Sequence, residues 1–425
     1  MVDLRLIREN PDLIRDGARK KRIGADIDGL LGLDATAREI RARLDGLRAE
    51  RNRGSEEVPR LKGEEKEKVI ARMREVSSEI KRLEPEHKAL DERIAELLLS
   101  VPNPPGEDVP VGETEEDNVE VRRCGEPPHF DFPPVDHVDL GVALDLIDIP
   151  RGVKLAGTRS YVLKNEGALL QWAVLRLAVD RMVRKGFTPM VIPVLVNEAP
   201  MVGTGYFPIG RDQAYHVEKD SAFLVGTAEV SLTSYRSDEI LSEGDLPLKT
   251  VGLSACFRRE AGTYGKDTRG LFRIHQFEKV EQVVLCLNDE SESARWHDTI
   301  LGNAEEIVQD LGLPYRVVAV CTGDLGIGQV RKHDIECWMP SRNAYGETHS
   351  CSSFHEFQAR RLNMRYRDAE GRLRFVHTLN NTVVASPRIL IPILENNQQR
   401  DGSVVVPLVL RPYMGGQEVI EPKGM

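Results

Sequence analysis

The sequence contains few aromatic residues, few cysteines and no long apolar run. Aromatic side chains make up 5% of its 425 residues, and the six cysteines are scattered without a CxxC pair. No apolar stretch is long enough to span a bilayer, so no membrane partner is expected. The cysteines have no histidine nearby at ligand spacing, which favours buried thiols in a reducing compartment. We therefore expect no zinc, with a site built from distant cysteines as the alternative.

The first residues and the overall charge exclude two further classes. Asp3 and Arg5 interrupt the start of the chain, so no apolar core of a signal peptide can be drawn, and the sequence predicts a cytoplasmic protein. The formal net charge of −10 argues against indiscriminate binding of nucleic acid. DNA is therefore not an expected partner, whereas an RNA held on one local surface stays open.

The clearest pattern that is present is a heptad repeat near the amino terminus. Apolar residues follow alternating steps of four and three at Leu33, Ala37, Ile40, Leu44 and Leu47. After a break, the same spacing resumes over residues 69–97 with His87 as the one polar exception. The break is marked by Gly54, Pro59 and Gly63. Two such helices predict an antiparallel helical hairpin over about residues 30–100.

The hairpin should project from the body as an arm. Its second helix, over about residues 64–99, would be about 50 Å long at about 1.5 Å per residue. Both helices are dense in charged residues outside the seam, so nothing is expected to cover their outer faces. A coiled-coil dimerisation stalk is the alternative. Acidic and basic residues nearly balance, and RNA binding by the arm does not follow from its composition.

Prolines mark a linker after the arm. Residues 101–105 read VPNPP and residues 131–134 read DFPP, and such prolines stop both helices and central strands. We place the boundary within 100–130, which gives an N-terminal domain at 1–110 and a second domain at 111–425.

The second domain alternates helices with short β-rich runs. Residues 167–185 have helical periodicity and Gly186 as their stop, and 188–196 indicate a strand interrupted by Pro193. Further strands are expected at 250–257, 272–287, 315–320, 334–339 and 374–384, and helices at 291–311 and 388–399. Neither GxxxxGK[ST] nor GxGxxG occurs, so any nucleotide must be held by other chemistry.

Residues 255–282 carry the strongest chemical signal. They combine two strand-like ends with a polar, glycine-rich loop. Alternation along a strand puts Arg258 and Glu260 on one face of the first strand. On the second strand it groups Arg273, His275, Phe277, Lys279 and Glu281. Guanidinium groups suit a triphosphate, a ring can stack on a base, and a carboxylate can accept from an amine. The segment therefore predicts an ATP platform, with a solvated face laced with ion pairs as the alternative.

The same segment, FRREAGTYGKDTRGLFRIHQFEKVE at 257–281, resembles motif 2 of class II aminoacyl-tRNA synthetases in the form characteristic of bacterial-type seryl-tRNA synthetases. Three further segments agree: VGTAEV at 225–230, ETHSCSSFHEFQARR at 347–361 and HTLNNTVVASPRILIPILENNQ at 377–398. Their order behind the hairpin matches that family over essentially the whole chain. The resemblance implies an α+β fold, in which the helical hairpin precedes a class II catalytic domain with a mainly antiparallel β-sheet flanked by helices.

The resemblance also implies an ATP site. Arg258 would hold the α-phosphate, and Glu260 would accept from the adenine amine. Phe277 would stack on adenine beside backbone contacts from Ile274, and Arg388 would reach the terminal phosphates. The remaining residues implied for ATP are Arg259, Arg273, Glu347, Thr348, His349 and Ser350. Of the whole set, the resemblance gives catalytic roles to Arg258, Arg388 and Glu347.

Serine and Mg²⁺ are the other implied ligands. Thr227 and Glu229 would bind the backbone groups of serine, and Glu281 and Thr382 would hydrogen-bond its hydroxyl. A buried carboxylate and hydroxyl left unpaired would penalise alanine, which lacks the OH group. The remaining implied contacts with serine come from Ala228 and Arg258. Mg²⁺ would take oxygen ligands from Glu347 and Ser350, in keeping with its preference for carboxylates and phosphates.

The implied reaction has two steps and no covalent enzyme intermediate. Serine and ATP give seryl-adenylate, and serine then passes to the 3′ end of tRNA(Ser). The loop 261–269 would meet the acceptor end, and the arm would grip the long variable arm of the tRNA across a homodimer built on 167–185. The same tRNA shape extends the expectation to selenocysteine tRNA, tRNA(Sec).

Some features depart from this pattern or leave alternatives. Motif 3 is usually glycine-rich, but Asn381, Val383 and Pro387 occupy the matching positions here. Ser386 and Pro387 are still expected to be the N-cap and first residue of the following helix. A metal triad formed by Glu347, His349 and His355 is a minor alternative. The rival functions are a carrier-loading paralogue, an inactive RNA-binding protein and another class II synthetase such as a threonyl enzyme.

Overall fold

The computed structural model describes residues 1–262 and 269–422. The chain divides into two compact units, one of residues 1–19 and 23–102 and the other of 20–22 and 103–425. No helix among the described residues is long and apolar enough to cross a membrane.

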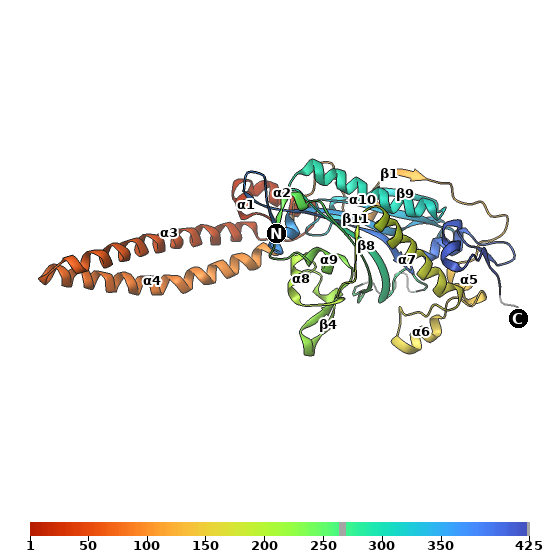
Figure 1. Ribbon diagram of the computed structural model, residues 1–425, viewed down its shortest axis with the longest axis horizontal. Helices are drawn as coiled ribbons and strands as arrows, with labels where there is room; N and C mark the ends of the chain where they lie inside the picture. The colour runs from red at the N-terminus through yellow and green to blue at the C-terminus, as the bar shows by residue number, and fades with distance from the viewer. Residues whose placement is uncertain (263–268, 423–425) are drawn as a thin grey trace. The chain divides into compact units, whose positions relative to one another are not determined.

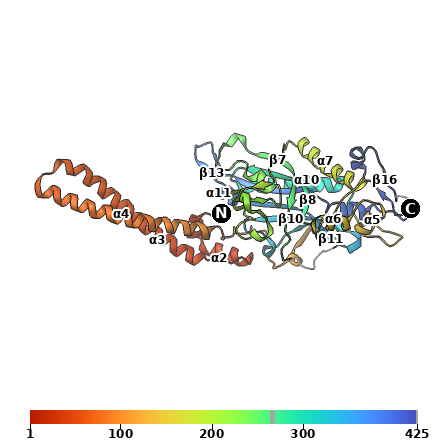
Figure 2. The ribbon, with the colours of Figure 1, turned by 90° about the horizontal axis from the view of Figure 1, so that it is seen from below.

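The first unit contains the predicted hairpin. Its four helices are α1 (Leu4–Glu9), α2 (Pro11–Lys20), α3 (Ile27–Glu57) and α4 (Gly63–Leu98). Helices α3 and α4 run side by side in both views (Figures 1 and 2). Between them, the heptad residues bury a seam of Leu44, Leu47, Val76, Ile80 and Leu83. The hairpin prediction is confirmed, and the helix ends agree within a few residues.

The predicted break between the helices is wrong at Gly54. This residue lies inside α3, and the turn is confined to the short segment around Val58–Arg60. A β-carbon at Gly54 would lie 2.3 Å from Sδ of Met73. Gly54 therefore permits a close approach of the two helices near the tip, and it does not end the helix.

The second unit is built on an eight-stranded sheet. In spatial order the strands are β1 (Val119–Cys124), β9 (Tyr315–Ala319), β10 (Arg331–Met339), β11 (Ala344–His355), β14 (His377–Ser386), β8 (Gln276–Cys286), β7 (Leu248–Phe257) and β2 (Thr188–Met190). All neighbouring pairs are antiparallel except β2 and β7. The predicted class, a mainly antiparallel sheet flanked by helices, is confirmed.

Smaller elements surround this sheet. Two three-stranded sheets consist of β3 (Leu195–Val196), β5 (Ala222–Leu224) and β4 (Tyr215–Val217), and of β13 (Leu373–Phe375), β12 (Arg365–Arg367) and β6 (Ile240–Ser242), while β15 (Val404–Val405) pairs with β16 (Val419–Ile420). The helices are α5 (His137–Ala143), α6 (Ile149–Ala156), α7 (Glu166–Arg184), α8 (Glu198–Gly203), α9 (Glu229–Ser234), α10 (Glu290–Asp310), α11 (Phe357–Arg361) and α12 (Leu390–Asn396).

Helices α7 and α10 pack on the sheet through one continuous apolar core. The inner face of α7 is buried through Leu170, Val174, Leu177, Ala178 and Met182. Gly186 follows the helix in the left-handed conformation with φ of +80°. Two amide side chains fix α10 to the inner strands, because Gln282 of β8 and Asn381 of β14 both donate to the carbonyl oxygen of Ile300. Alternation along the strands then leaves Glu281 and Thr382 on the opposite face of the sheet.

Several predicted boundaries need correction. The strand expected at 272–287 begins only at Gln276, and the strand expected at 374–384 is two strands, β13 and β14. Ser386 is not an N-cap: it is the last residue of β14, its hydroxyl donates to Oε1 of Gln171, and α12 starts at Leu390. The N-cap position of α12 belongs to Ile389, three residues further along the chain.

The structure accommodates the residues that replace glycine in motif 3. Asn381 points toward α10, where its amide donates to Ile300, and Val383 is buried in the main core. The side chains at these two positions therefore fill space on the helix-covered face of β14.

Candidate active site

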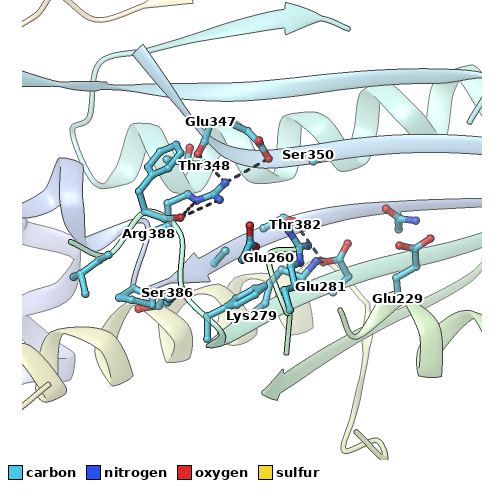
Figure 3. Close-up of a pocket in the computed structure, with 18 of the residues that line it drawn as sticks. Glu229, Glu260, Lys279, Glu281, Glu347, Thr348, Ser350, Thr382, Ser386 and Arg388 are labelled. Atoms are coloured by element: carbon cyan, nitrogen blue, oxygen red, sulfur yellow. Dashed lines mark hydrogen bonds and ion pairs between the residues drawn. The ribbon is translucent and has the colours of Figure 1, made fainter. Parts of the chain in front are cut away.

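A cavity opens on the face of the sheet opposite α10. Figure 3 shows side chains from β8, β11 and β14 directed into it. The lining includes Arg258, Glu260, Ile274, Phe277, Glu281, Glu347, Thr348, Ser350, Thr382 and Arg388. Together with Glu229, which also lines the cavity, eleven residues implied by the resemblance meet in one place, although they come from distant parts of the sequence.

Arg258 and Glu260 reach the cavity from a loop. β7 ends at Phe257, so alternation does not place them, and the predicted shared strand face is wrong for this pair. Nε of Arg258 donates to the carbonyl oxygen of Gly226 at 3.3 Å, and its guanidinium lies 5.2 Å from the ring centroid of Phe277. Glu260 has φ of +52°, a conformation rare outside glycine and concentrated at functional sites.

Arg273 and His275 also lie outside the strand in which they were predicted, since β8 starts only at Gln276. Nη1 of Arg273 lies 3.4 Å from Oε2 of Glu260 and so connects the two ends of the motif 2 segment. The backbone of His275 donates to the carbonyl oxygen of Arg159 and accepts from the amide of Arg258. Irregular backbone held by these contacts, not strand alternation, brings the charged groups together.

Arg388 and Glu347 form the other end of the cavity. Nη1 of Arg388 lies 3.6 Å from Oε1 of Glu347 and donates to its carbonyl oxygen at 3.2 Å. Desolvation by itself would raise the pKa of Glu347, but the positive charges of Arg388, Lys332 and Arg258 outweigh it and lower that pKa. The carboxylate is therefore ionised and ready to meet a cation.

Glu229 forms a buried anionic corner. Its carboxylate accepts from Oη of Tyr206 at 3.1 Å and from Nε2 of Gln358 at 2.8 Å, and its backbone amide donates to Oγ1 of Thr227. Burial, reinforced by the nearby charge of Glu281, raises the pKa of Glu229 to about 7. A bound cation would stabilise the ionised form of this carboxylate, which has little contact with water.

A polar trio lies beside this corner on the inner strands. Glu281 forms a buried ion pair with Lys279, which lies two residues before it on β8. Oγ1 of Thr382 on β14 donates to Oε2 of Glu281 at 3.5 Å (Figure 3). The trio offers hydroxyl, carboxylate and ammonium groups to a small polar ligand.

Comparisons with known proteins agree with this geometry. A model of the seryl-tRNA synthetase N-terminal domain matches residues 1–105, and a model of the class II tRNA synthetase core domain (G, H, P, S and T) matches 215–397. The chain is 47% identical over 420 residues to a serine–tRNA ligase of Deinococcus radiodurans, with 99% of each chain covered. The chain belongs to the seryl-tRNA synthetase family.

Solved structures of this family have the same fold. The crystal structure of seryl-tRNA synthetase from Pyrococcus horikoshii complexed with ATP matches with a TM-score of 0.94 and 40% identity, covering 100% of both chains. The cytoplasmic serine–tRNA ligase of Naegleria fowleri in complex with AMP matches with a TM-score of 0.89 and 32% identity, covering 100% of this chain and 99% of that one.

Five residues predicted from the seryl-tRNA synthetase resemblance do not line the central cavity, and one of them, Arg273, lines the adjoining cleft. His349 is buried and its Nδ1 contacts Oγ1 of Thr348, while Nη1 of Arg259 donates to the carbonyl oxygen of Asp212. Thr227 and Ala228 directly precede Glu229 in the chain and are buried. Conversely, the lining includes residues for which the resemblance implied no role: Tyr206, Phe272, Gln329, Ser352, Asn380 and Lys279, the last of which was predicted only as a member of the charged strand face. Lys279 was visible by its alternation with Glu281, whereas Tyr206 carries no local signal.

The cavity of this seryl-tRNA synthetase family member also fits a divalent cation. Glu347 and Ser350 both line it, and Asp334 of β10 lies opposite Ser350 in the sheet register. Oδ2 of Asp334 pairs with Nζ of Lys332 at 2.9 Å, whereas Oδ1 is buried without a hydrogen-bond donor and is a further oxygen near Ser350. Within the described residues, no cluster of three or more histidine, cysteine or acidic side chains forms a metal site, including the triad of Glu347 with His349 and His355.

Proposed function

We propose that the protein activates serine with ATP and transfers it to tRNA(Ser). The observation that carries this proposal is that one cavity contains both two guanidinium groups, which suit a triphosphate, and a carboxylate–hydroxyl pair, which suits the hydroxyl of serine. Arg258 and Arg388 supply the first, and Glu281 and Thr382 supply the second. Full-length relatives with the name serine–tRNA ligase support the same substrates.

ATP would lie across the cavity with its base against Phe277. Arg258 would bind the α-phosphate, and Arg388 would bind the terminal phosphates. Positive charge fixed at these positions stabilises the negative charge that develops as the serine carboxylate attacks the α-phosphate and pyrophosphate leaves. Glu260 would accept from the adenine amine. The relative crystallised with ATP supports this assignment of the nucleotide.

Glu347 and Ser350 would hold Mg²⁺, whose usual partners are one or two protein oxygens together with substrate phosphates. The bound ion would neutralise charge on the triphosphate. Glu347 would then both bind the metal ion and hold Arg388, whose Nη1 lies 3.6 Å from Oε1 of Glu347.

Serine would occupy the corner between Glu229 and Glu281. Glu229 would bind its ammonium group, and Glu281 with Thr382 would bind its hydroxyl. Lys279 holds the carboxylate of Glu281 in place through their buried ion pair. Alanine has no hydroxyl, so its binding would leave the buried polar groups of Glu281 and Thr382 without a hydrogen-bond partner. The site would therefore bind alanine more weakly than serine.

The second step would use the same cavity and an RNA partner. The 3′ end of tRNA(Ser) would attack seryl-adenylate, and the hairpin α3–α4 would bind the long variable arm by shape. We extend the proposal to tRNA(Sec), which shares that shape.

The functional enzyme would be a homodimer. Helix α7 exposes Leu169, Trp172 and Val183 on one stripe, and Trp172 is 61% exposed. Exposed apolar side chains on the helix to which the resemblance assigns the homodimer contact suit a second copy of this chain.

Serine-dependent exchange of pyrophosphate into ATP, followed by charging of purified tRNAs, tests the function. Exchange and charging with serine would support the proposal. Exchange without charging would indicate a carrier-loading enzyme, absence of exchange an inactive RNA-binding protein, and exchange with threonine a different synthetase.

A further inference from the structure

A buried histidine connects motif 2 to motif 3 behind the cavity. Nδ1 of His137, the first residue of α5, lies 2.8 Å from Oε1 of Glu395 near the end of α12. Nε2 of the same ring accepts from the backbone amide of Leu271 at 3.2 Å. The His137 side chain is 8% exposed and that of Glu395 is 0% exposed, so neither contact is shared with bulk water.

The partners of His137 fix its protonation. The amide of Leu271 can only donate, so Nε2 must be an unprotonated acceptor and Nδ1 must carry the hydrogen that Glu395 accepts. Glu395 in turn accepts from the backbone amide of His137 and from both the amide and the hydroxyl of Ser341. Every partner of this carboxylate is a donor, which suits its ionised form.

Glu395 thereby holds two segments that flank one aromatic ring. On one side, His137 fixes Leu271, and the next residue is Phe272. On the other side, Ser341 precedes Arg342, whose guanidinium lies 4.1 Å from the ring centroid of Phe272. The carboxylate of Glu395 therefore helps to position both the ring of Phe272 and the guanidinium of Arg342 that stacks on it.

Arg388 contacts the same ring. Its guanidinium lies 4.4 Å from the ring centroid of Phe272, and its Nε and Nη2 donate to the carbonyl oxygen of Phe272 at 3.2 and 3.1 Å. Arg388 precedes α12 and lies seven residues before Glu395, which is inside that helix. A continuous series of contacts therefore runs from Glu395 through His137, Leu271 and Phe272 to Arg388.

A neighbouring glycine makes this arrangement possible. Gly270 has φ of +92°, and a β-carbon there would lie 2.3 Å from Nε2 of His137. Next to it, Nη1 of Arg269 donates to Asp136, the N-cap residue of α5, at 2.9 Å. The start of α5 therefore anchors the carboxyl end of the motif 2 loop at two adjacent points.

We propose that His137 is a positioning residue for ATP, which acts through Leu271 and Phe272 to set Arg388 at the terminal phosphates. The proposal rests on the role of Arg388 in the proposed function. His137 itself does not line the cavity and touches no substrate. Loss of its bond to Leu271 would let the Leu271–Phe272 backbone shift, and the acceptor that orients Arg388 would shift with it.

Two conservative variants separate the two contacts of the ring. The amide of asparagine superposes on the Nδ1 side of imidazole, so His137→Asn keeps a donor for Glu395 and loses the acceptor for Leu271. The longer glutamine reaches the Nε2 position, so His137→Gln keeps the acceptor and loses the donor. We expect His137→Asn to raise KM for ATP about tenfold, the equivalent of one lost hydrogen bond, with KM for serine unchanged. His137→Gln should restore KM for ATP to near the wild-type value.

His297→Asn is the matched control. His297 is also fully buried between two partners, with Nδ1 2.8 Å from Oγ of Ser353 and Nε2 2.8 Å from Nδ1 of His333, and it lies outside the cavity. Its replacement should lower Tm without changing KM for ATP. If His137→Asn likewise lowers only Tm, or if both His137 variants raise KM for ATP equally, the proposal is overturned.

Thermal shift on ATP addition gives the second readout, since it needs no serine and no turnover. A weaker shift for His137→Asn than for His137→Gln supports the positioning role even if serine-dependent exchange fails, in which case only the proposed function falls. Equal shifts in the two variants overturn the positioning role whatever the exchange assay gives.

Discussion

Thr382 and Glu281 face each other across neighbouring strands, and the hydroxyl of Thr382 donates to the carboxylate of Glu281 at 3.5 Å. The pair lies on the cavity face of β14 and β8, while the adjacent residues Asn381 and Gln282 bind α10 on the other face. Because side chains alternate along a strand, one pair of residues faces the cavity and the neighbouring pair holds α10 on the other side of the sheet. The long distance leaves room for a substrate hydroxyl to join both groups.

Removing the hydroxyl of Thr382 should weaken discrimination between serine and alanine. Thr382→Val has nearly the same shape and no donor, so we expect KM for serine to rise about tenfold, as one lost hydrogen bond implies. Thr382→Ser keeps the hydroxyl and is the control. Pyrophosphate exchange with serine and with alanine measures both effects. An unchanged ratio of kcat/KM for the two amino acids would place the hydroxyl of serine elsewhere.

The affinity for serine should depend on pH through Glu229. Burial first, and then the charge of Glu281, raises the pKa of its carboxyl to about 7. Protons and the serine ammonium group compete for the ionised carboxylate. As pH falls below about 7, the free enzyme becomes protonated there, and KM for serine should rise by about tenfold per pH unit.

Glu229→Gln provides the control for that pH dependence. The amide cannot ionise, so KM for serine should be high at every pH and flat between pH 5 and 7, at about the range where the wild type changes. A wild-type KM that is level over this range would show that Glu229 does not bind the ammonium group.

Replacement of Arg258 should abolish most activation. Arg258→Ala removes the guanidinium proposed for the α-phosphate, and loss of one such fixed donor costs about 100- to 1,000-fold in kcat. Serine-dependent exchange measures this step. Arg236→Ala is the control, because Arg236 pairs with Glu239 away from the cavity. Near-normal exchange in Arg258→Ala would show that another residue holds the α-phosphate.

Deletion of residues 35–97 should separate the two steps. The seam residues of α3 and α4 pack against each other inside one compact unit, so a short glycine–serine linker can replace them without opening the other unit's core. We expect serine-dependent exchange to persist and charging of tRNA(Ser) to collapse. Survival of charging would show that the arm has no role in RNA binding.

A charge on the exposed stripe of α7 should prevent dimer formation. Trp172→Glu places a carboxylate in the proposed apolar interface, so we expect the particle mass in analytical ultracentrifugation to fall by about half, since buried unpaired charges are costly. Leu13→Glu, at an exposed apolar residue of α2, is the control. A wild type that sediments as a monomer would rule out the dimer.

Periodic segments were predictable because one physical cause sets them. The hairpin and α7 each bury a regular apolar stripe, and their observed ends lie within a few residues of the predicted ones. Gly54 was misread because glycine lowers helix propensity, yet contact with Met73 decides its role, and that contact joins the two helices.

The sequence predicted which residues line the cavity better than how the backbone brings them there. Glu281 and Thr382 were placed by resemblance, and both lie in regular strands, so their orientation follows from alternation. Arg258 and Glu260 lie just past a strand end, where tertiary contacts override local pattern. Tyr206 could not be found, because it reaches Glu229 from a segment that has no periodicity.

The carbonyl oxygen of Ile300 accepts side-chain amides from two adjacent strands. A helix held at its midpoint by both strands cannot slide lengthwise past them without breaking both bonds. Shear between this layer and the sheet is therefore blocked where the amino acid would bind. Warming the protein should loosen its periphery before it changes the spacing of the groups that distinguish one small amino acid from another.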